Sequence, residues 1–265
     1  MDLFRFRAGT SPLLVAMPHV GTYLPVELAA RMTGAALALP DTDWHVDRLY
    51  DFLDALDAST LIATHSRYVI DLNRPHDNAS LYPGQDTTSL VPIDTFTRER
   101  IYRDGQAPDD TDIKFRVQHY WRPYHEQLQH ELARLRAVHG YALLWDAHSI
   151  ASVVPRFFAG QLPDLNLGTV DGSSCAAFIE RTVTEAARRA SSYTTVLNGR
   201  FKGGYTTRAY GRPTEHVHAI QLELSQRIYM NEGPPFAFRD DLAARLGPVL
   251  RDLLAAFVTA ARASA

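Results

Sequence analysis

The sequence predicts a single α/β domain over residues 1–265, with a mixed central sheet flanked by helices. Short apolar runs alternate with segments whose apolar residues recur every three to four positions, and this alternation is typical of strands and helices in α/β proteins. The length suits one large domain, and no repeat, low-complexity linker or composition shift marks a second one.

The expected strands are short apolar runs bounded by turn-forming residues. They lie near residues 12–18, 60–64, 67–72, 141–147, 154–158, 194–197 and 218–224. Open α/β sheets bind ligands at the carboxyl ends of their strands, so residues that close these runs are candidates for function.

The expected helices lie at 43–57, 112–138, 173–190 and 237–262, where apolar residues share one helical face. Pro123 interrupts the second of these and should kink or break it, because proline has no backbone N–H. The polar segment 76–95 is expected to be a long loop, and long loops in compact domains are often functional.

Composition excludes several classes of function. The formal net charge is −3 and no basic run is present, so nucleic acid is not an expected partner. No apolar stretch could span a bilayer, and the first residues lack the apolar core of a signal peptide, so we expect a cytoplasmic protein. Cys175 is the single cysteine and is predicted to be a buried structural thiol. The sequence leaves the oligomeric state open.

Two of the predicted strands end in histidine, which indicates a shared metal or acid/base site. The first run ends in His19, and the fourth ends in Asp146-Ala-His148. Catalytic zinc takes three protein ligands, so a third is needed. Asp43 and Asp47 lie four residues apart on one expected helix face, and either could supply it. Asp43 could instead be a helix N-cap, and a lone histidine could be structural.

Arginine and asparagine residues indicate an anionic small-molecule substrate. Arg67 and Arg74 bracket one predicted strand, and Asn73-Arg74 stands at its exit. An arginine fork grips carboxylates bidentately, although a surface arginine and a turn asparagine are the alternative. The glycine-containing segment 198–208 carries Lys, Tyr and Arg208 and could close over an anion, or be a simple surface turn.

Glu223 lies inside the apolar run 218–224. Such a glutamate is costly to bury unless it is paired or functional, so we expect a general base. A salt bridge with Arg227 is the alternative.

Taken together, these motifs resemble the N-formylglutamate amidohydrolase (deformylase) family from about residue 12 to about residue 230. The motifs that carry the resemblance are Met17-Pro-His19-Val-Gly21, Asp41-Thr-Asp43-Trp, Ser66-Arg67…Asp71-Leu-Asn73-Arg74-Pro75, Pro123-Tyr-His125, Asp146-Ala-His148-Ser149, Asp164-Leu-Asn-Leu-Gly168-Thr, Phe201-Lys-Gly-Gly204-Tyr and Gln221-Leu-Glu223.

The resemblance implies a fold similar to zinc carboxypeptidases and to the succinylglutamate desuccinylase and aspartoacylase group. It implies metal ligation by His19 and His148, a catalytic Glu223, and carboxylate binding by Asn73 and Arg74. The wider group has His-x-x-Glu as its first two ligands, but Thr22 stands at the Glu position here. Asp43 is therefore the expected acidic ligand, with Asp47 in reserve.

By resemblance, the expected reaction converts N-formyl-L-glutamate to formate and L-glutamate, in histidine breakdown. One divalent metal is expected, zinc first and cobalt or iron as alternatives. Arg67 would stabilise the oxyanion with the metal, and Arg208 would help to hold the substrate. The alternatives are an amidohydrolase for another N-acyl amino acid or a short peptide, and a non-catalytic amino-acid-binding protein.

Overall fold

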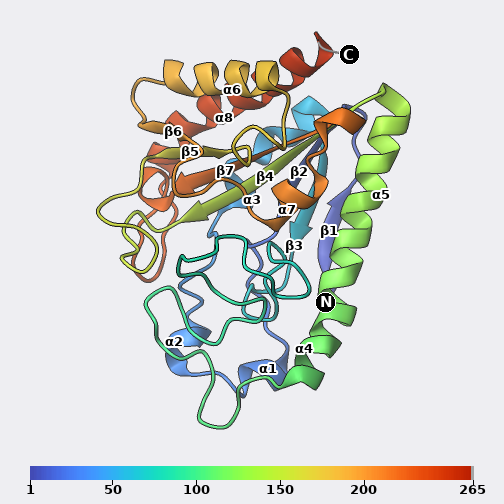
Figure 1. The fold of residues 1–265 in the computed structure, drawn as a ribbon. Helices are drawn as coiled ribbons and strands as arrows, with labels where there is room; N and C mark the ends of the chain where they lie inside the picture. Colours follow the sequence, from blue (N-terminus) through green and yellow to red (C-terminus); the bar gives the residue numbers. More distant parts are fainter. Residues whose placement is uncertain (264–265) are drawn as a thin grey trace.

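A seven-stranded mixed sheet forms the centre of the molecule (Figure 1), whose computed structural model describes residues 1–263. The strand order is β1-β3-β2-β4-β7-β5-β6. The strands are β1 (Phe4–Arg7), β2 (Leu13–Met17), β3 (Ser59–Ala63), β4 (Ala142–Ile150), β5 (Leu165–Gly168), β6 (Thr195–Leu197) and β7 (Val217–Ser225).

The middle of the sheet is parallel. β3, β2, β4 and β7 run in one direction, while β1 and β5 each pair antiparallel with a neighbour. Every residue of β2, β4 and β7 is buried, as expected for strands covered on both faces. The carboxyl ends of these three strands therefore meet at one edge of the sheet.

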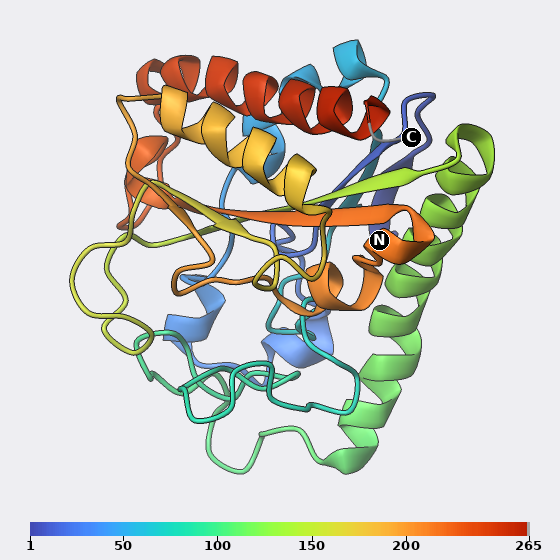
Figure 2. The ribbon, with the colours of Figure 1, turned by 45° about the horizontal axis from the view of Figure 1, so that its top comes forward.

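Helices cover both faces of the sheet (Figure 2). Leu143 and Trp145 of β4 share a core cluster with residues of α6 and α8. Leu144, one step along the same strand, faces a second cluster that contains residues of α5, because successive side chains of a strand point to opposite faces. The helices are α1 (Val26–Ala29), α2 (Gly34–Leu37), α3 (Val46–Leu49), α4 (Asp110–Arg116), α5 (Arg122–His139), α6 (Ala177–Arg189), α7 (Tyr205–Tyr210) and α8 (Asp240–Arg262).

The predicted helix is continuous, and Pro123 interrupts only its α-helical pattern. α4 and α5 are joined without a gap by one π-helical turn, Val117–Trp121, which lies directly before Pro123, a residue with no N–H to donate within the helix. The turn directs Trp121 and His125 toward the segment that follows Ile70. Trp121 Nε1 donates to the Arg74 carbonyl oxygen at 2.9 Å, and His125 Nε2 lies 2.9 Å from the carbonyl oxygen of Leu72.

Two predicted strands are absent, because tertiary contacts override their apolar pattern. Residues 67–72 form a turn and an irregular segment, in which the Val69 N–H donates to Ser66 and the Asp71 N–H donates to Leu90 rather than to a sheet neighbour. Residues 154–158 also form a turn, with the Phe157 N–H donating to the Val154 carbonyl oxygen.

The prediction of one helix over 43–57 was wrong. His45 adopts a positive φ of 62°, so α3 begins only at Val46, and a separate 3₁₀ helix follows at Asp51–Leu56. Asp43 and Asp47 consequently do not share a helix face. The predicted strand list also missed β1 and β5, which are four residues each.

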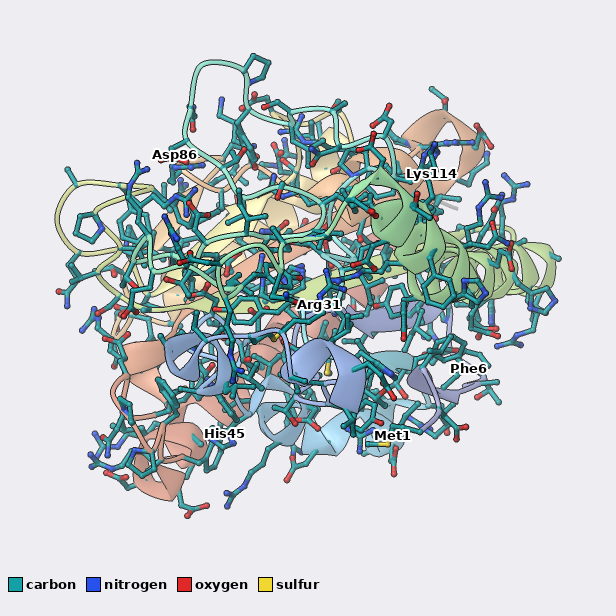
Figure 3. The ribbon with its side chains drawn as sticks, turned by 90° about the horizontal axis from the view of Figure 1, so that it is seen from below. Met1, Phe6, Arg31, His45, Asp86 and Lys114 are labelled. Carbon is teal, nitrogen blue, oxygen red and sulfur yellow. The ribbon has the colours of Figure 1, made fainter. Side chains whose placement is uncertain are left out.

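Irregular chain covers the carboxyl edge of the sheet (Figure 1), and Figure 3 looks onto this side. The expected loop 76–95 is confirmed and carries Asp86, which Figure 3 labels. Cys175 is buried as predicted, and burial raises the pKa of its thiol to about 12. Among residues 1–263, no helix has the length and apolar character needed to cross a membrane.

Candidate active site

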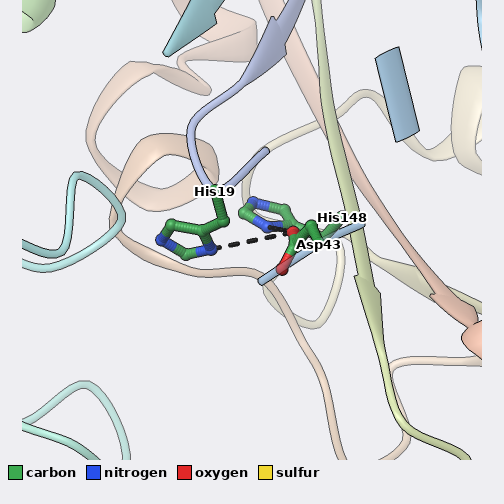
Figure 4. Close-up of side chains that lie close together, drawn as sticks. All are labelled: His19, Asp43 and His148. Carbon is green, nitrogen blue, oxygen red and sulfur yellow. Dashed lines mark hydrogen bonds and ion pairs between the residues drawn. The ribbon is translucent and has the colours of Figure 1, made fainter. Parts of the chain in front are cut away.

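His19, Asp43 and His148 meet at the carboxyl edge of the sheet (Figure 4). His19 stands two residues beyond the end of β2, and His148 lies near the end of β4. Asp43 reaches them from the chain before α3, where its backbone N–H donates to the His19 carbonyl oxygen at 3.0 Å. The fold thus joins two adjacent parallel strands and one loop at this point.

These three side chains could hold a metal ion. One donor atom from each lies within 4.8 Å of the others, and all three residues are buried. Asp43 Oδ2 lies 2.9 Å from His148 Nδ1 and 3.7 Å from His19 Nδ1. Two imidazole nitrogens and a carboxylate oxygen form the kind of donor set that catalytic zinc uses, with a further position open.

The outer nitrogen of each histidine contacts a buried carboxylate. His19 Nε2 lies 2.7 Å from Asp71 Oδ1, and His148 Nε2 lies 3.0 Å from Asp146 Oδ1. A carboxylate in this position fixes the orientation of a metal-binding imidazole and directs its other nitrogen toward the metal. At His148, Nε2 also lies 2.9 Å from Asn73 Nδ2, so it either donates to Asp146 or accepts from Asn73, and the first tautomer is the one that suits metal binding. Both aspartates stand in the sequence motifs, but no local pattern indicates this role for them, because their contacts depend on the folded chain.

The environments of the two histidines shift their pKa values in opposite directions. Burial, aided by Arg67, lowers the pKa of His19. Burial also opposes the charged form of His148, but the nearby carboxylates of Asp146 and Asp43 outweigh it and raise that pKa well above its usual value. His148 Nδ1 and Asp43 Oδ2, which lie 2.9 Å apart, belong to two of the three candidate ligands.

Arg67 lies between the two carboxylates nearest His19. Its Nη2 donates to Asp71 Oδ2 at 2.6 Å, and its Nη1 lies 3.8 Å from Asp43 Oδ1. Burial opposes ionisation of Asp71, yet His19 and Arg67 hold the pKa of that carboxyl well below its usual range. Arg67 Nε is buried and makes no hydrogen bond to any residue in 1–263. This cation is therefore fixed beside the three candidate ligands with one donor unused.

Glu223 stands beside His148 in the register of β4 and β7 and lines the same cavity. Burial raises the pKa of its carboxyl. Its expected alternative partner, Arg227, instead bonds Asp164 at 2.5 Å.

Gln221 positions the Glu223 carboxylate. Its Nε2 donates to Glu223 Oε2 at 3.0 Å, while its Oε1 accepts from the Gly204 N–H at 2.6 Å and so fixes which end of the amide faces the acid. Sequence reasoning quoted Gln221 without a role, and its period-two spacing from Glu223 was the available signal.

The predicted Asn73-Arg74 pair lies in the same cavity. Asn73 Oδ1 accepts from the Thr206 N–H at 2.8 Å, which directs its Nδ2 toward His148 Nε2 at 2.9 Å. Gly204 must lack a side chain here, because an added Cβ would lie 2.2 Å from Asn73 Nδ2. Arg74 is only weakly paired. Its Nε lies as far as 3.9 Å from Asp71 Oδ2, and its hydrogen bond to Thr88 Oγ1 is long, at 3.4 Å.

The cavity brings together all but one of the site residues that the sequence predicted. The exception is Arg208, whose Nε donates to the Gly203 carbonyl oxygen and whose guanidinium lies over the Tyr82 ring, outside the lining. The reserve ligand Asp47 is also distant, since it pairs with Arg5 at the surface. The predicted site residues in the lining are His19, Asp43, Arg67, Asn73, Arg74, His148 and Glu223.

Arg200 lines the cavity as well, whereas the prediction for this segment was Arg208. Both arginines flank the glycine-containing stretch, so nothing in the sequence alone distinguishes them.

Comparison with known proteins matches residues 11–230 to the N-formylglutamate amidohydrolase family. The N-formylglutamate deformylase of Pseudomonas aeruginosa is 51% identical over 253 residues, covering 96% of this chain and 95% of the relative. The N-formylglutamate deformylase of Pseudomonas putida is 49% identical over the same length, covering 96% and 94%.

Solved structures with a similar fold are more distant in sequence. One is N-formylglutamate amidohydrolase from Ralstonia eutropha, with a TM-score of 0.81, 24% identity, and coverage of 99% of this chain and 98% of that one. A gene product from Agrobacterium tumefaciens has a TM-score of 0.69 at 18% identity, with 96% of each chain covered. These two similarities support the fold.

Proposed function

The chain belongs to the N-formylglutamate amidohydrolase family, and from this premise we propose that it hydrolyses N-formyl-L-glutamate to formate and L-glutamate. The observation that carries the proposal is one cavity that combines a three-residue metal-ligand set, a buried glutamate and incompletely neutralised arginines. The deformylases named above support the choice of substrate. Histidine degradation is the pathway we propose for this reaction.

His19, Asp43 and His148 are the proposed ligands of one divalent metal, for which zinc is our first choice and cobalt or iron the alternatives. When bound, zinc would activate water for attack and polarise the formyl carbonyl. The donor chemistry supports this choice, as do the buried carboxylates behind both imidazoles. The same arrangement underlies our proposal that the fold is related to that of zinc carboxypeptidases, with residues 1–265 forming a single catalytic unit.

The proton and charge steps are assigned to residues of this chain. Glu223 accepts the proton of the attacking water and passes it to the leaving amine, and its raised pKa suits a group that must both take and give a proton. Arg67, a buried cation that lines the cavity close to Asp43, stabilises the negative charge that develops on the carbonyl oxygen. Arg74 binds a substrate carboxylate beside Asn73.

Formate release from a panel of N-acyl amino acids tests the proposed function. We expect N-formyl-L-glutamate to be the preferred substrate of the purified protein, with about one metal ion per chain by elemental analysis. A chelator should abolish turnover and added zinc should restore it. Preference for another acyl group would favour a different amidohydrolase of this fold, and neither turnover nor stoichiometric metal would favour an amino-acid-binding protein.

Replacement of Arg74 by alanine is expected to damage carboxylate recognition. A charge-assisted hydrogen bond contributes about 1.5–3 kcal/mol, so kcat/KM for N-formyl-L-glutamate should fall roughly tenfold to hundredfold. The loss should be much smaller for 4-formamidobutanoate, which lacks the α-carboxylate. Arg74→Lys should not restore full efficiency, because an ammonium cannot reproduce the planar fork. Equal losses on both substrates would place Arg74 outside the carboxylate pocket.

A further inference from the structure

Arg200 is held in the cavity wall by backbone oxygens from two distant segments. Its Nε donates to the Phe157 carbonyl oxygen at 2.6 Å, and its Nη2 donates to the Asp86 carbonyl oxygen at 3.3 Å. These two acceptors fix the plane of the guanidinium without neutralising its charge. Its other terminal nitrogen, Nη1, makes no hydrogen bond to any residue in 1–263.

The Asp86 carboxylate does not pair with Arg200, because it is bonded to other arginines. Asp86 gives its backbone oxygen to Arg200 but its carboxylate to Arg156, at 3.1 Å, and to Arg98. Across the described part of the chain, no carboxylate pairs with Arg200. Burial lowers the pKa of Arg200, and the charges of Tyr82, Glu223 and Asp86 oppose this only in part. The wall of the cavity therefore presents a fixed positive charge that a bound anion could neutralise.

Aromatic rings surround this cation. Its guanidinium carbon lies 5.3 Å from the ring centroids of both Tyr82 and Phe201, and 5.8 Å from that of Phe157. All three residues line the same cavity. Rings at these distances exclude water from the guanidinium, which strengthens its attraction for a carboxylate, and they offer an apolar surface to methylene groups.

Arg74 and Arg200 form two separate cationic positions in one cavity. The two cations repel each other, and the charge of Arg200 is among the causes that lower the pKa of Arg74. Arg74 belongs to the segment of Asp71, the carboxylate that orients His19, so it lies on the side of the candidate metal ligands. Arg200 is bound instead to the loops around Phe157 and Asp86.

We propose that Arg200 binds the side-chain carboxylate of N-formyl-L-glutamate and determines the preference for a dianionic substrate. This inference rests on the proposed function. The α-carboxylate is adjacent to the scissile amide and suits Arg74, whereas the α-carbon and two methylene groups separate it from the second carboxylate. Those methylenes would lie against the rings of Tyr82, Phe157 and Phe201, and the second carboxylate would meet the free Nη1 of Arg200.

The test compares N-formyl-L-glutamate with N-formyl-L-glutamine, whose side chain has the same shape and no charge. Arg200→Met should lower kcat/KM for the glutamate substrate roughly tenfold to hundredfold and change that for the glutamine substrate by no more than a few-fold. Arg200→Lys should keep part of the preference as a point charge. Inhibition constants of L-glutamate and L-glutamine provide the same comparison without turnover of the amide.

Lys202→Met is the matched control. Lys202 lies on the same segment, but its Nζ pairs with Asp171 at 3.0 Å and it does not line the cavity, so both substrates should be unaffected. If Arg200→Met proves unstable, Arg200→Gln, which can still donate to a backbone carbonyl, replaces it. Equal losses on both substrates would overturn the inference while the proposed function stands. A wild-type protein that releases no formate from N-formyl-L-glutamate would overturn both.

Discussion

Replacement of His148 by alanine is expected to abolish binding of the proposed metal and nearly all activity while the protein remains folded. His148 is one of the three candidate ligands found among residues 1–263, and its Nδ1 lies 2.9 Å from the second, Asp43 Oδ2. Two remaining donors cannot complete the three-ligand set of a catalytic zinc site. Elemental analysis of the purified variant, with circular dichroism to confirm the fold, measures the effect.

Two aspartate variants control this result. Asp43→Ala should lose the metal as His148→Ala does, because it removes the donor between the two histidines. Asp47→Ala should keep both metal and activity, since Asp47 contacts Arg5 and the Arg48 backbone N–H near the surface, and exposed ion pairs contribute little to stability. Full metal content in folded His148→Ala would refute the assignment of this ligand set.

Glu223→Gln is expected to lower kcat by about 10²–10⁴-fold, the usual contribution of a general acid–base group. The two side chains have nearly the same shape, and the glutamine carbonyl oxygen can still accept the bond from Gln221 Nε2. Metal content and inhibition by L-glutamate should therefore be close to those of the wild type. Steady-state kinetics with metal analysis on the same sample separates loss of chemistry from loss of the site.

Glu131→Gln is a suitable control because Glu131 is equally buried but lies outside the cavity, bonded to Arg134 and Ser59. It should alter stability and leave kcat unchanged. Turnover of Glu223→Gln within a few-fold of wild type would mean that Glu223 is structural and that another group acts as the base.

The convergence of His19 and His148 could be predicted from the sequence because it needs only two facts. Each residue closes an apolar run, and parallel strands bring their carboxyl ends to the same edge. Glu223 could be identified for a similar reason, since a charge within a buried strand must have a partner or a role.

Other parts of the site depend on contacts that no local pattern contains. The segment 67–72 has the apolar content of a strand, but the buried pair of Arg67 with Asp71 and the bond from the Asp71 N–H to Leu90 hold it in an irregular path. Asp43 reaches the histidines although the helix expected to carry it begins three residues later, because its backbone is bonded to His19. The sequence could not indicate that Arg200 rather than Arg208 lines the cavity, since the two differ in the carbonyl oxygens to which they donate in the folded chain.

The cavity is lined partly by residues of buried strands and partly by residues of loops. His148 and Glu223 project from adjacent, fully buried strands, whereas Arg200 and the oxygens that hold it belong to loops. Loops tolerate substitution and insertion more readily than buried strands. Evolution can therefore alter which acyl amino acid is accepted without disturbing the groups proposed to break the amide bond. The same separation makes the loop residues around Arg200 the natural target for redesigning selectivity in this scaffold.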